Sequence, residues 1–231
     1  MKKKVISILF VIICAIITVL YNNYSYSSHG VNNYSKSVLD VSPYDGSSSY
    51  VIINNNEPEF LSDDLVARSY EFYSDLDSLG RASVAMSSIG TDLMPTEERG
   101  NIGSVKPSGW HTIKYDFING KYLYNRCHLI GYQLTGENAN EKNLITCTRQ
   151  TNTGIMLEYE NKVAKYIKET NNHVLYRVTP IYENNNLVAS GIQMEAMSVE
   201  DNGTGIKFNI YIYNVQDGVN IDYETGESKE V

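Results

Sequence analysis

Two residues on one short segment have side chains suited to the chemistry of phosphate esters. Arg126 and His128 stand two apart in the run Asn125 to Gly131, and a β-strand would direct both to the same face. A neutral imidazole can take a proton from water, and a planar guanidinium matches the oxygens of a phosphate. An Arg and a His on one strand face are also common as purely structural residues, so this pair alone does not decide the chemistry.

Asn152 and Glu160 form a second pair of candidate residues, eight positions apart. The amide oxygen of Asn152 is a neutral hard ligand that could hold Mg²⁺ while leaving most of the coordination shell to water and phosphate. Asn152 could equally cap the helix that follows it. Glu160 falls on the inward stripe of that helix, where an unpaired carboxylate is unfavourable. A metal-bound water or a salt bridge to Arg or Lys would each satisfy it.

The elements that must position these residues follow from the spacing of apolar side chains. Helical spacing predicts an amphipathic helix over residues 157–170. The turn dipeptide Asn119-Gly120 predicts a hairpin, and the acidic residues from 217 to the end are expected to be irregular. Strand patterns occupy residues 50–53, 111–117, 121–124, 173–181, 187–198 and 206–213. Strands, a chemistry-bearing segment, a helix and an antiparallel meander predict an α+β fold.

The charge of the chain is unevenly distributed. The whole chain has a formal net charge of -8, but residues 110–180 hold nine Lys and Arg against six Asp and Glu. The segments on either side, residues 22–109 and 181–231, are each acidic. A locally positive middle segment could attract a polyanion within a Debye length although the whole molecule is acidic. A chance fluctuation would give the same pattern.

The N-terminus predicts export. Three lysines precede an uncharged, mostly apolar run, so residues 1–21 are interpreted as a signal peptide or a membrane anchor, with a slight preference for the anchor. Residues 22–37 are rich in Asn, Tyr and Ser and are expected to form a flexible spacer. Residues 38–231 are of a size for one domain. We therefore expect an extracellular or cell-surface protein that contacts the membrane only if the N-terminus stays uncleaved.

The cysteines limit the chemistry further. Cys14 lies in the apolar run, which leaves Cys127 and Cys147 in the exported part. No CxxC motif or Cys/His cluster with zinc spacing occurs, so neither a redox motif nor a structural zinc site is indicated. One disulfide between Cys127 and Cys147 and two free thiols both remain open, because cross-strand register cannot be read from sequence.

Several motifs resemble, in order, those of the DNA/RNA non-specific endonucleases with a ββα-metal (His-Me finger) core. The resemblance covers residues 43–228. The matching stretches are residues 77–81, 94–96, 106–110, 125–134, 138–152 and 171–180. The resemblance implies an antiparallel central sheet that carries the ββα-metal core. It also implies magnesium-dependent hydrolysis of DNA and RNA without sequence specificity, leaving 5′-phosphate ends, with Mn²⁺ as an alternative ion.

The resemblance also implies roles for individual residues. The family's Asp/Asn-Arg-Gly-His motif falls on residues 125–128, which makes His128 the general base; the metal-binding Asn falls on Asn152 and the helix Glu on Glu160. Cys127 and Cys147 stand where the family has glycine. Arg126 is the first candidate for phosphate contact, although it could equally brace the hairpin through a buried carboxylate. Weaker candidates for substrate binding are Arg99, Lys106 and Arg149, whereas His111 and His173 are interpreted as structural.

Two other functions compete with a nuclease. A catalytically silent surface protein that captures DNA for uptake or adhesion would share the basic middle segment. Only catalysis requires His128 and Asn152 together. A base-specific ribonuclease is disfavoured, since contacts limited to phosphate carry no sequence code.

Overall fold

The computed structural model describes residues 38 and 41–231. The predicted export segment at residues 1–21 and the predicted spacer at residues 22–37 lie outside the described residues. Within the described part of the chain, no helix has the length and apolar character needed to cross a membrane.

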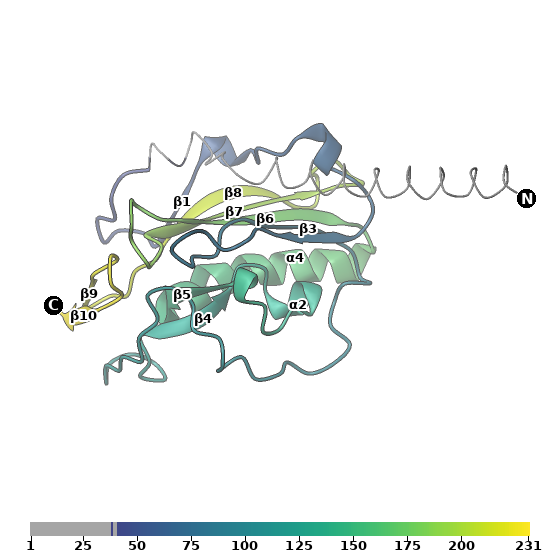
Figure 1. Cartoon of the computed structure of the whole chain (residues 1–231). Helices are drawn as coiled ribbons and strands as arrows, with labels where there is room; N and C mark the ends of the chain where they lie inside the picture. The colour runs from purple at the N-terminus through teal and green to yellow at the C-terminus, as the bar shows by residue number, and fades with distance from the viewer. Residues whose placement is uncertain (1–37, 39–40) are drawn as a thin grey trace, which may run out of the picture. The chain divides into compact units, whose positions relative to one another are not determined.

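A six-stranded antiparallel sheet forms one layer of the domain (Figure 1). Its strands run in the order β1-β8-β7-β6-β3-β2. They are β1 (Tyr50–Ile52), β2 (Tyr70–Tyr73), β3 (Ala85–Ile89), β6 (Val174–Ile181), β7 (Gly191–Ser198) and β8 (Lys207–Tyr213). The predicted antiparallel meander of the last three strands is confirmed, with every residue of β6 paired to β7.

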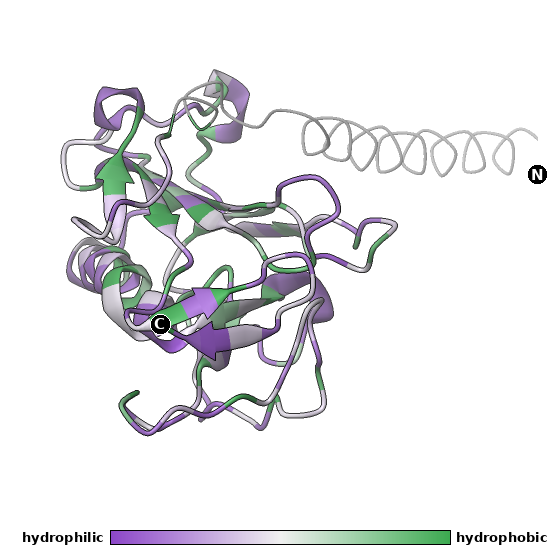
Figure 2. Ribbon diagram, turned by 90° about the vertical axis from the view of Figure 1, so that its left-hand side faces the viewer, coloured by the Kyte–Doolittle hydropathy of each residue, from purple (hydrophilic) through white to green (hydrophobic). Residues whose placement is uncertain are grey.

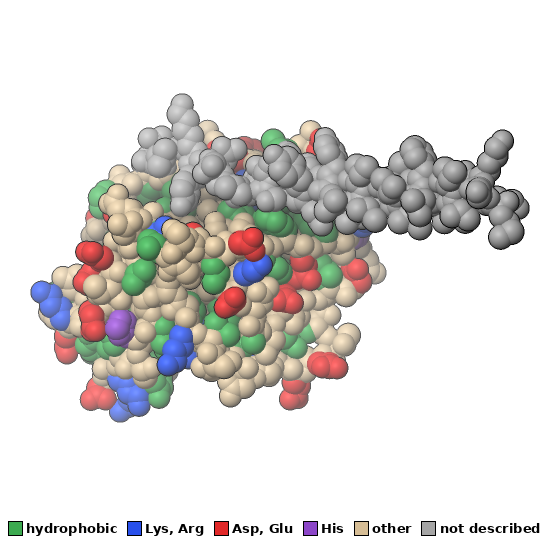
Figure 3. Space-filling view, viewed as in Figure 1, with side chains coloured by type: hydrophobic (Ala, Val, Ile, Leu, Met, Phe, Trp, Pro, Cys, Tyr) green, Lys and Arg blue, Asp and Glu red, His purple; other side chains and the backbone are tan. Residues whose placement is uncertain are grey.

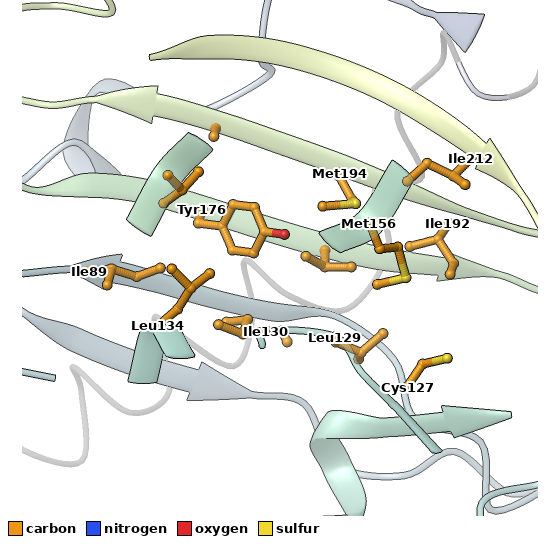
Figure 4. Packing of buried hydrophobic residues seen from close by; sticks show 14 of the residues in the cluster. Ile89, Cys127, Leu129, Ile130, Leu134, Met156, Tyr176, Ile192, Met194 and Ile212 are labelled. Atoms are coloured by element: carbon orange, nitrogen blue, oxygen red, sulfur yellow. The ribbon is translucent and has the colours of Figure 1, made fainter. Parts of the chain in front are cut away.

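Helix α4 (Leu157–Thr170) packs against one face of this sheet (Figure 1). Its bounds agree with the helix predicted from sequence, and its side chains Val163, Ala164 and Ile167 are buried against the sheet. Leu157, predicted for the buried side, is instead 40% exposed. Apolar side chains from the sheet, the helix and the loop after β4 fill the space between the layers, among them Tyr176 and Ile130 (Figure 4). This core fixes the position of the helix relative to the sheet.

A separate two-stranded sheet lies on the other side of α4 (Figure 1). Strand β4 (Tyr124–His128) pairs antiparallel with β5 (Leu144–Thr148), with His128 opposite Leu144. Between them lie α2 (Tyr132–Thr135) and the 3₁₀ turn η4 (Glu141–Asn143), and β5 leads directly into α3 (Arg149–Thr151), the irregular turn η5 (Asn152–Met156) and α4. Two strands followed by a helix form the predicted ββα arrangement.

A disulfide joins the two strands of this unit. Cys127 and Cys147 are bridged, with their Cα atoms 5.8 Å apart. Both residues are fully buried. Of the two alternatives left open by the sequence, the structure therefore has the bridge, and the two departures from the family's glycines are partners of each other.

One prediction about local structure was right only in part, and another was wrong. Residues 111–124 reverse at the predicted turn and pair antiparallel, but through a single β-bridge, Lys114 to Tyr122, and not as regular strands. The acidic C-terminal residues are not irregular: they form the hairpin of β9 (Val219–Ile221) and β10 (Ser228–Glu230) (Figures 1 and 2). Its turn is held by the main chain, where Gly226 N–H donates to the Asp222 carbonyl at 2.7 Å. Ile221 of this hairpin packs in a small core with residues 110–124.

The remaining described elements are the 3₁₀ turns η2 (Asn54–Asn56) and η3 (Ser62–Asp64). On the face shown in Figure 3, acidic and basic side chains are interspersed. Among the described residues, several of these charges form pairs across the surface, such as Lys207 with Glu57 at 2.7 Å.

Candidate active site

One cavity of about 690 Å³ brings most of the predicted site residues together. It is bounded by β4, by the start of the α3–α4 segment and by the loops around residues 99–102 and 110–122. The predicted site residues among its lining are Arg99, Arg126, His128, Arg149, Asn152 and Glu160. Lys106 does not line it. Glu160 is the only acidic side chain in the lining, so the cavity has a positive character.

His128 is positioned by the end of β4 and by the main chain of Asn138. Its Nε2 atom lies 2.7 Å from the Asn138 carbonyl oxygen, and its Nδ1 atom lies 3.4 Å from a guanidinium nitrogen of Arg99. Because a carbonyl oxygen can only accept, Nε2 carries the proton and donates it, which leaves the lone pair on Nδ1. The ring is therefore held in the tautomer that a base requires.

The surroundings of His128 also favour the neutral ring. Burial lowers the pKa of the His128 imidazole below its ordinary value, and the charge of Arg99 lowers it further, against the opposing effect of the Asn138 carbonyl. A neutral imidazole accepts a proton, whereas an imidazolium cannot. The imidazole therefore stays neutral down to a lower pH than that of an exposed histidine.

Asn152 has a side chain without a structural function among the described residues. It is half-buried, lines the cavity and makes no side-chain hydrogen bond to any residue that the structure describes. The cap of this helical segment is Thr148, whose hydroxyl accepts from Thr151 N–H at 3.1 Å. The alternative interpretation of Asn152 as a helix cap is therefore wrong.

Glu160 faces the same cavity from the first turn of α4. Its side chain is 8% exposed and lies so close to Gly131 that a Cβ atom at that position would be 2.4 Å from Oε2. Burial raises the pKa of Glu160 to about 8, although hydrogen bonds from Gln133 and the Gly131 amide and the charge of Arg99 act in the opposite direction. No salt bridge satisfies this carboxylate within the described residues.

Arg126 serves first as a brace. Its guanidinium donates to the carbonyl oxygens of Val105 and, at 2.9 Å, of Gly103, and it stacks over the ring of Trp110 at 4.0 Å. Of the two alternatives for Arg126, the bracing contacts are thus present, but they go to backbone carbonyls and an aromatic ring instead of a carboxylate. Since Arg126 also lines the cavity, its charge still acts there.

The other predicted cations differ in position. The Arg149 guanidinium packs near Gly120 and makes no ion pair with a described residue; Arg99 is exposed beside His128. Lys106 is exposed outside the cavity lining. His111 contacts the Thr225 carbonyl at 3.1 Å and His173 pairs with Glu200 at 2.7 Å, and neither lines the cavity.

The donor set fits Mg²⁺ held largely by water. No cluster of three or more His, Cys, Asp or Glu that could hold a metal occurs within residues 38 and 41–231. The cavity instead offers amide oxygens, among them that of Asn152, and one buried carboxylate, from Glu160. Hard oxygen donors in small number suit Mg²⁺, which retains several waters and uses substrate phosphate oxygens as ligands.

Three contributors to the site were missed by sequence reasoning. The Asn138 carbonyl orients His128, Gly131 makes room for Glu160, and Trp110 supports Arg126. Gly131 lies three residues after His128, so its position was a usable signal. The other two lie 10 and 16 residues from their partners in loops, where spacing carries no information.

Comparison with known proteins identifies the family. Residues 62–200, more than half of the chain, match the family model described as DNA/RNA non-specific endonuclease. The chain belongs to this family. A curated relative, a deoxyribonuclease of Streptococcus dysgalactiae subsp. equisimilis, is 33% identical over 110 residues, which are 46% of this chain. The match spans about a third, 32%, of that relative's length.

Solved structures of nucleases share the fold of this endonuclease family member. NucA from Streptococcus agalactiae, with magnesium ion bound, is 29% identical with a TM-score of 0.68, covering 78% of this chain and 86% of that chain. The Sda1 nuclease with bound zinc ion is 27% identical with a TM-score of 0.58, covering 70% and 80%. The predicted α+β fold with a large antiparallel sheet and a ββα core is confirmed.

Proposed function

We propose that this chain is a magnesium-dependent endonuclease that hydrolyses phosphodiester bonds of DNA and RNA without sequence specificity. The observation that carries the proposal is the shared cavity, where the Nδ1 lone pair of His128, the free amide of Asn152 and unpaired arginines meet. Family membership and the likeness to NucA with magnesium bound support it. Cations and amides contact phosphate, which carries no sequence code.

In the proposed mechanism His128 is the general base. Its Nδ1 atom takes a proton from water as the water attacks phosphorus, and the Nε2–H bond to Asn138 keeps the ring in place. Asn152 would hold the metal directly, and Glu160 would hold one of its waters. Bound Mg²⁺ supplies positive charge to the phosphate and to the departing 3′ oxygen.

The arginines have separate roles in this proposal. Arg149 contacts a phosphate oxygen, since its guanidinium lines the cavity next to Asn152 and has no carboxylate partner in the described part of the chain. Arg99 contacts the attacked phosphate and keeps His128 neutral in the free protein. Arg126 contributes its charge while bracing the loop that carries Val105.

We also propose that the protein acts outside the cell. The lysine-led apolar N-terminus predicts export. A buried disulfide is typical of an oxidising compartment. Retention of the N-terminal segment would attach the enzyme to the membrane.

A plasmid-nicking assay with Mg²⁺ or with EDTA tests the enzyme against a silent DNA-binding protein. The enzyme nicks plasmid with Mg²⁺ and stops with EDTA, whereas a DNA-capture protein shifts the plasmid on a gel and cuts it in neither condition. Asn152→Ala should lose the magnesium-dependent activity and keep its melting temperature, because Thr148 and not Asn152 caps the helix. A variant that is fully active but less stable would refute the role of Asn152.

A further inference from the structure

One wall of the cavity is a fixed loop that ends in an exposed aromatic residue. Thr112, Asn119, Gly120 and Tyr122 all line the cavity from this loop. The loop is closed by main-chain hydrogen bonds, from Tyr115 N–H to the Lys121 carbonyl at 2.9 Å and from Leu123 N–H to the Ile113 carbonyl at 3.0 Å. The wall is therefore set before any substrate arrives.

Tyr122 is the exposed aromatic side chain of this wall. It is 46% exposed, and its hydroxyl makes no hydrogen bond to any described residue. The Lys114 ammonium lies over its ring, 4.6 Å from the centroid, and no aromatic ring of the described residues packs on it. Fixed at the cavity, half exposed and with no aromatic ring of the described residues packed on it, Tyr122 has the form of a stacking platform.

A second aromatic on the same loop shows that exposure alone does not define this feature. Phe117 is 50% exposed, similar to Tyr122. Its ring packs against Tyr115 with centroids 5.5 Å apart, and it does not line the cavity. Only Tyr122 combines exposure with a place on the substrate side.

Two cations without a carboxylate partner among the described residues lie at the loop that carries Tyr122. Arg149 lies against the turn, its Cζ atom 3.8 Å from where a Gly120 Cβ would be, and begins the helical segment that carries Asn152. Lys114 makes no ion pair with a described residue. Cations that hold successive phosphates around an aromatic ring are typical of grooves for single-stranded nucleic acid.

We propose that Tyr122 stacks on an unpaired nucleobase next to the phosphate that Arg149 contacts, so that the cleft prefers single-stranded nucleic acid. This inference rests on the proposed function, because it places the substrate in the same cavity. In a duplex each base is stacked and paired, so its π-face is unavailable to a side chain unless the base leaves the stack. The ring therefore recognises flexible strands without reading their sequence.

Binding to two strands that differ only in their bases tests the stacking. Fluorescence anisotropy would use the full chain in mild detergent and EDTA, with labelled oligo(dT) and an abasic strand of equal length and charge. We expect oligo(dT) to bind about tenfold more tightly than the abasic strand. Tyr122→Ala should remove this difference, whereas Tyr122→Phe and the matched control Phe117→Ala should retain it. Equal binding of both strands, or an unchanged ratio in Tyr122→Ala, would overturn the proposal.

Cleavage of the same oligo(dT) with Mg²⁺ separates this inference from the proposed function. Preferential binding without cleavage would refute the nuclease and leave the stacking supported. Cleavage with equal binding of both strands would refute the stacking and leave the nuclease supported. In the expected case, Tyr122→Ala raises KM for the single strand about tenfold at nearly constant kcat, because the ring binds a base away from the reacting atoms.

Discussion

Two arginines with nearly the same local contacts show how the cavity differs from the large sheet. Arg126 stacks on Trp110 and donates to the Gly103 carbonyl, and Arg177 of β6 stacks on Phe60 and donates to the Glu59 carbonyl at 3.0 Å. Arg177 also pairs with the buried Glu195 at 2.7 Å. Arg126 has no carboxylate partner among the described residues.

The same difference holds for the other cations of the two regions. Over the sheet, Lys207 pairs with Glu57. In the cavity, neither Arg99 nor Arg149 pairs with a carboxylate in the part of the chain that the structure describes. A neutralised guanidinium stabilises the fold, whereas an unneutralised one keeps a positive potential for an anion. Charge pairing therefore distinguishes the arginines of the cavity from Arg177 and Lys207 of the sheet.

The largest effect on the cleavage rate is expected from loss of His128, the proposed general base. His128→Ala should lower cleavage by about 10² to 10⁴-fold, the usual contribution of a positioned general base. His173→Ala, which removes the histidine paired with Glu200 outside the cavity, should leave kcat unchanged. Plasmid nicking and thermal unfolding of both variants check this; near-normal turnover of a folded His128→Ala protein would refute its role.

Exchanging the two kinds of arginine for alanine tests the comparison directly. Arg177→Ala leaves Glu195 buried without its cation, so the free energy of unfolding should fall by about 3 kcal/mol while DNA affinity keeps its salt dependence. Arg149→Ala should retain stability and lower the slope of log affinity against log salt by about 1. Denaturant unfolding and binding at several salt concentrations measure both. Lost stability in Arg149→Ala together with a lower salt slope in Arg177→Ala would contradict the distinction between structural and substrate-binding arginines.

Glu160→Gln should reduce activity by about 10 to 100-fold, as expected when a group that orients a metal's water is lost. Its amide has the shape to occupy the space over Gly131, so the melting temperature should not fall. The raised pKa, about 8 in the metal-free protein, means that Glu160 binds a proton near pH 7 and that Mg²⁺ binding should release it. Calorimetry in two buffers of different ionisation enthalpy detects this proton, which the Gln variant should not release.

The smallest effect concerns pH. In the proposed mechanism His128 acts when neutral, so the rate should fall as pH drops through the pKa of His128, which lies below its ordinary value. Arg99→Ala removes a positive charge that lowers this pKa, so the acid limb of kcat/KM should move to higher pH. Lys106→Ala, outside the cavity lining, should not move it. If the acid limb of kcat/KM moved to lower pH in Arg99→Ala, the assigned effect of Arg99 on the pKa of His128 would be contradicted.

Sequence pattern sufficed where local spacing determines structure. The helix over 157–170 and the strands after it are long and periodic, so the helix was predicted to the residue and the strand bounds to within four residues. Glu160 was correctly placed on the buried side for the same reason. The hairpin at 111–124 was predicted correctly only in its reversal and antiparallel pairing. Regular strands are absent because its apolar residues pack a loop on the C-terminal hairpin, which contributes Ile221.

Contacts between distant residues could not be derived in this way. Arg99 meets His128 across 29 positions, and the charge on residues 99–106 gives no sign of which cation will line the cavity. The bridge between Cys127 and Cys147 depends on register, because Cys127 pairs with Ile145 and Cys147 with Asn125. The C-terminal hairpin was missed because turn hydrogen bonds outweighed the acidic composition.

The irregular turn η5 sets the rotational relation of Asn152 and Glu160. On an uninterrupted α-helix, residues eight apart differ by about 80° around the axis, at roughly 100° per residue. At η5 the helix departs from regular geometry at Gly154, with φ −96° and ψ −114°, and takes up an additional residue. When one residue is absorbed, the directions in which Asn152 and Glu160 project from the axis differ by only about 20°. The interruption thus converts a spacing that would point amide and carboxylate to different sides into one that aims both at the same cavity.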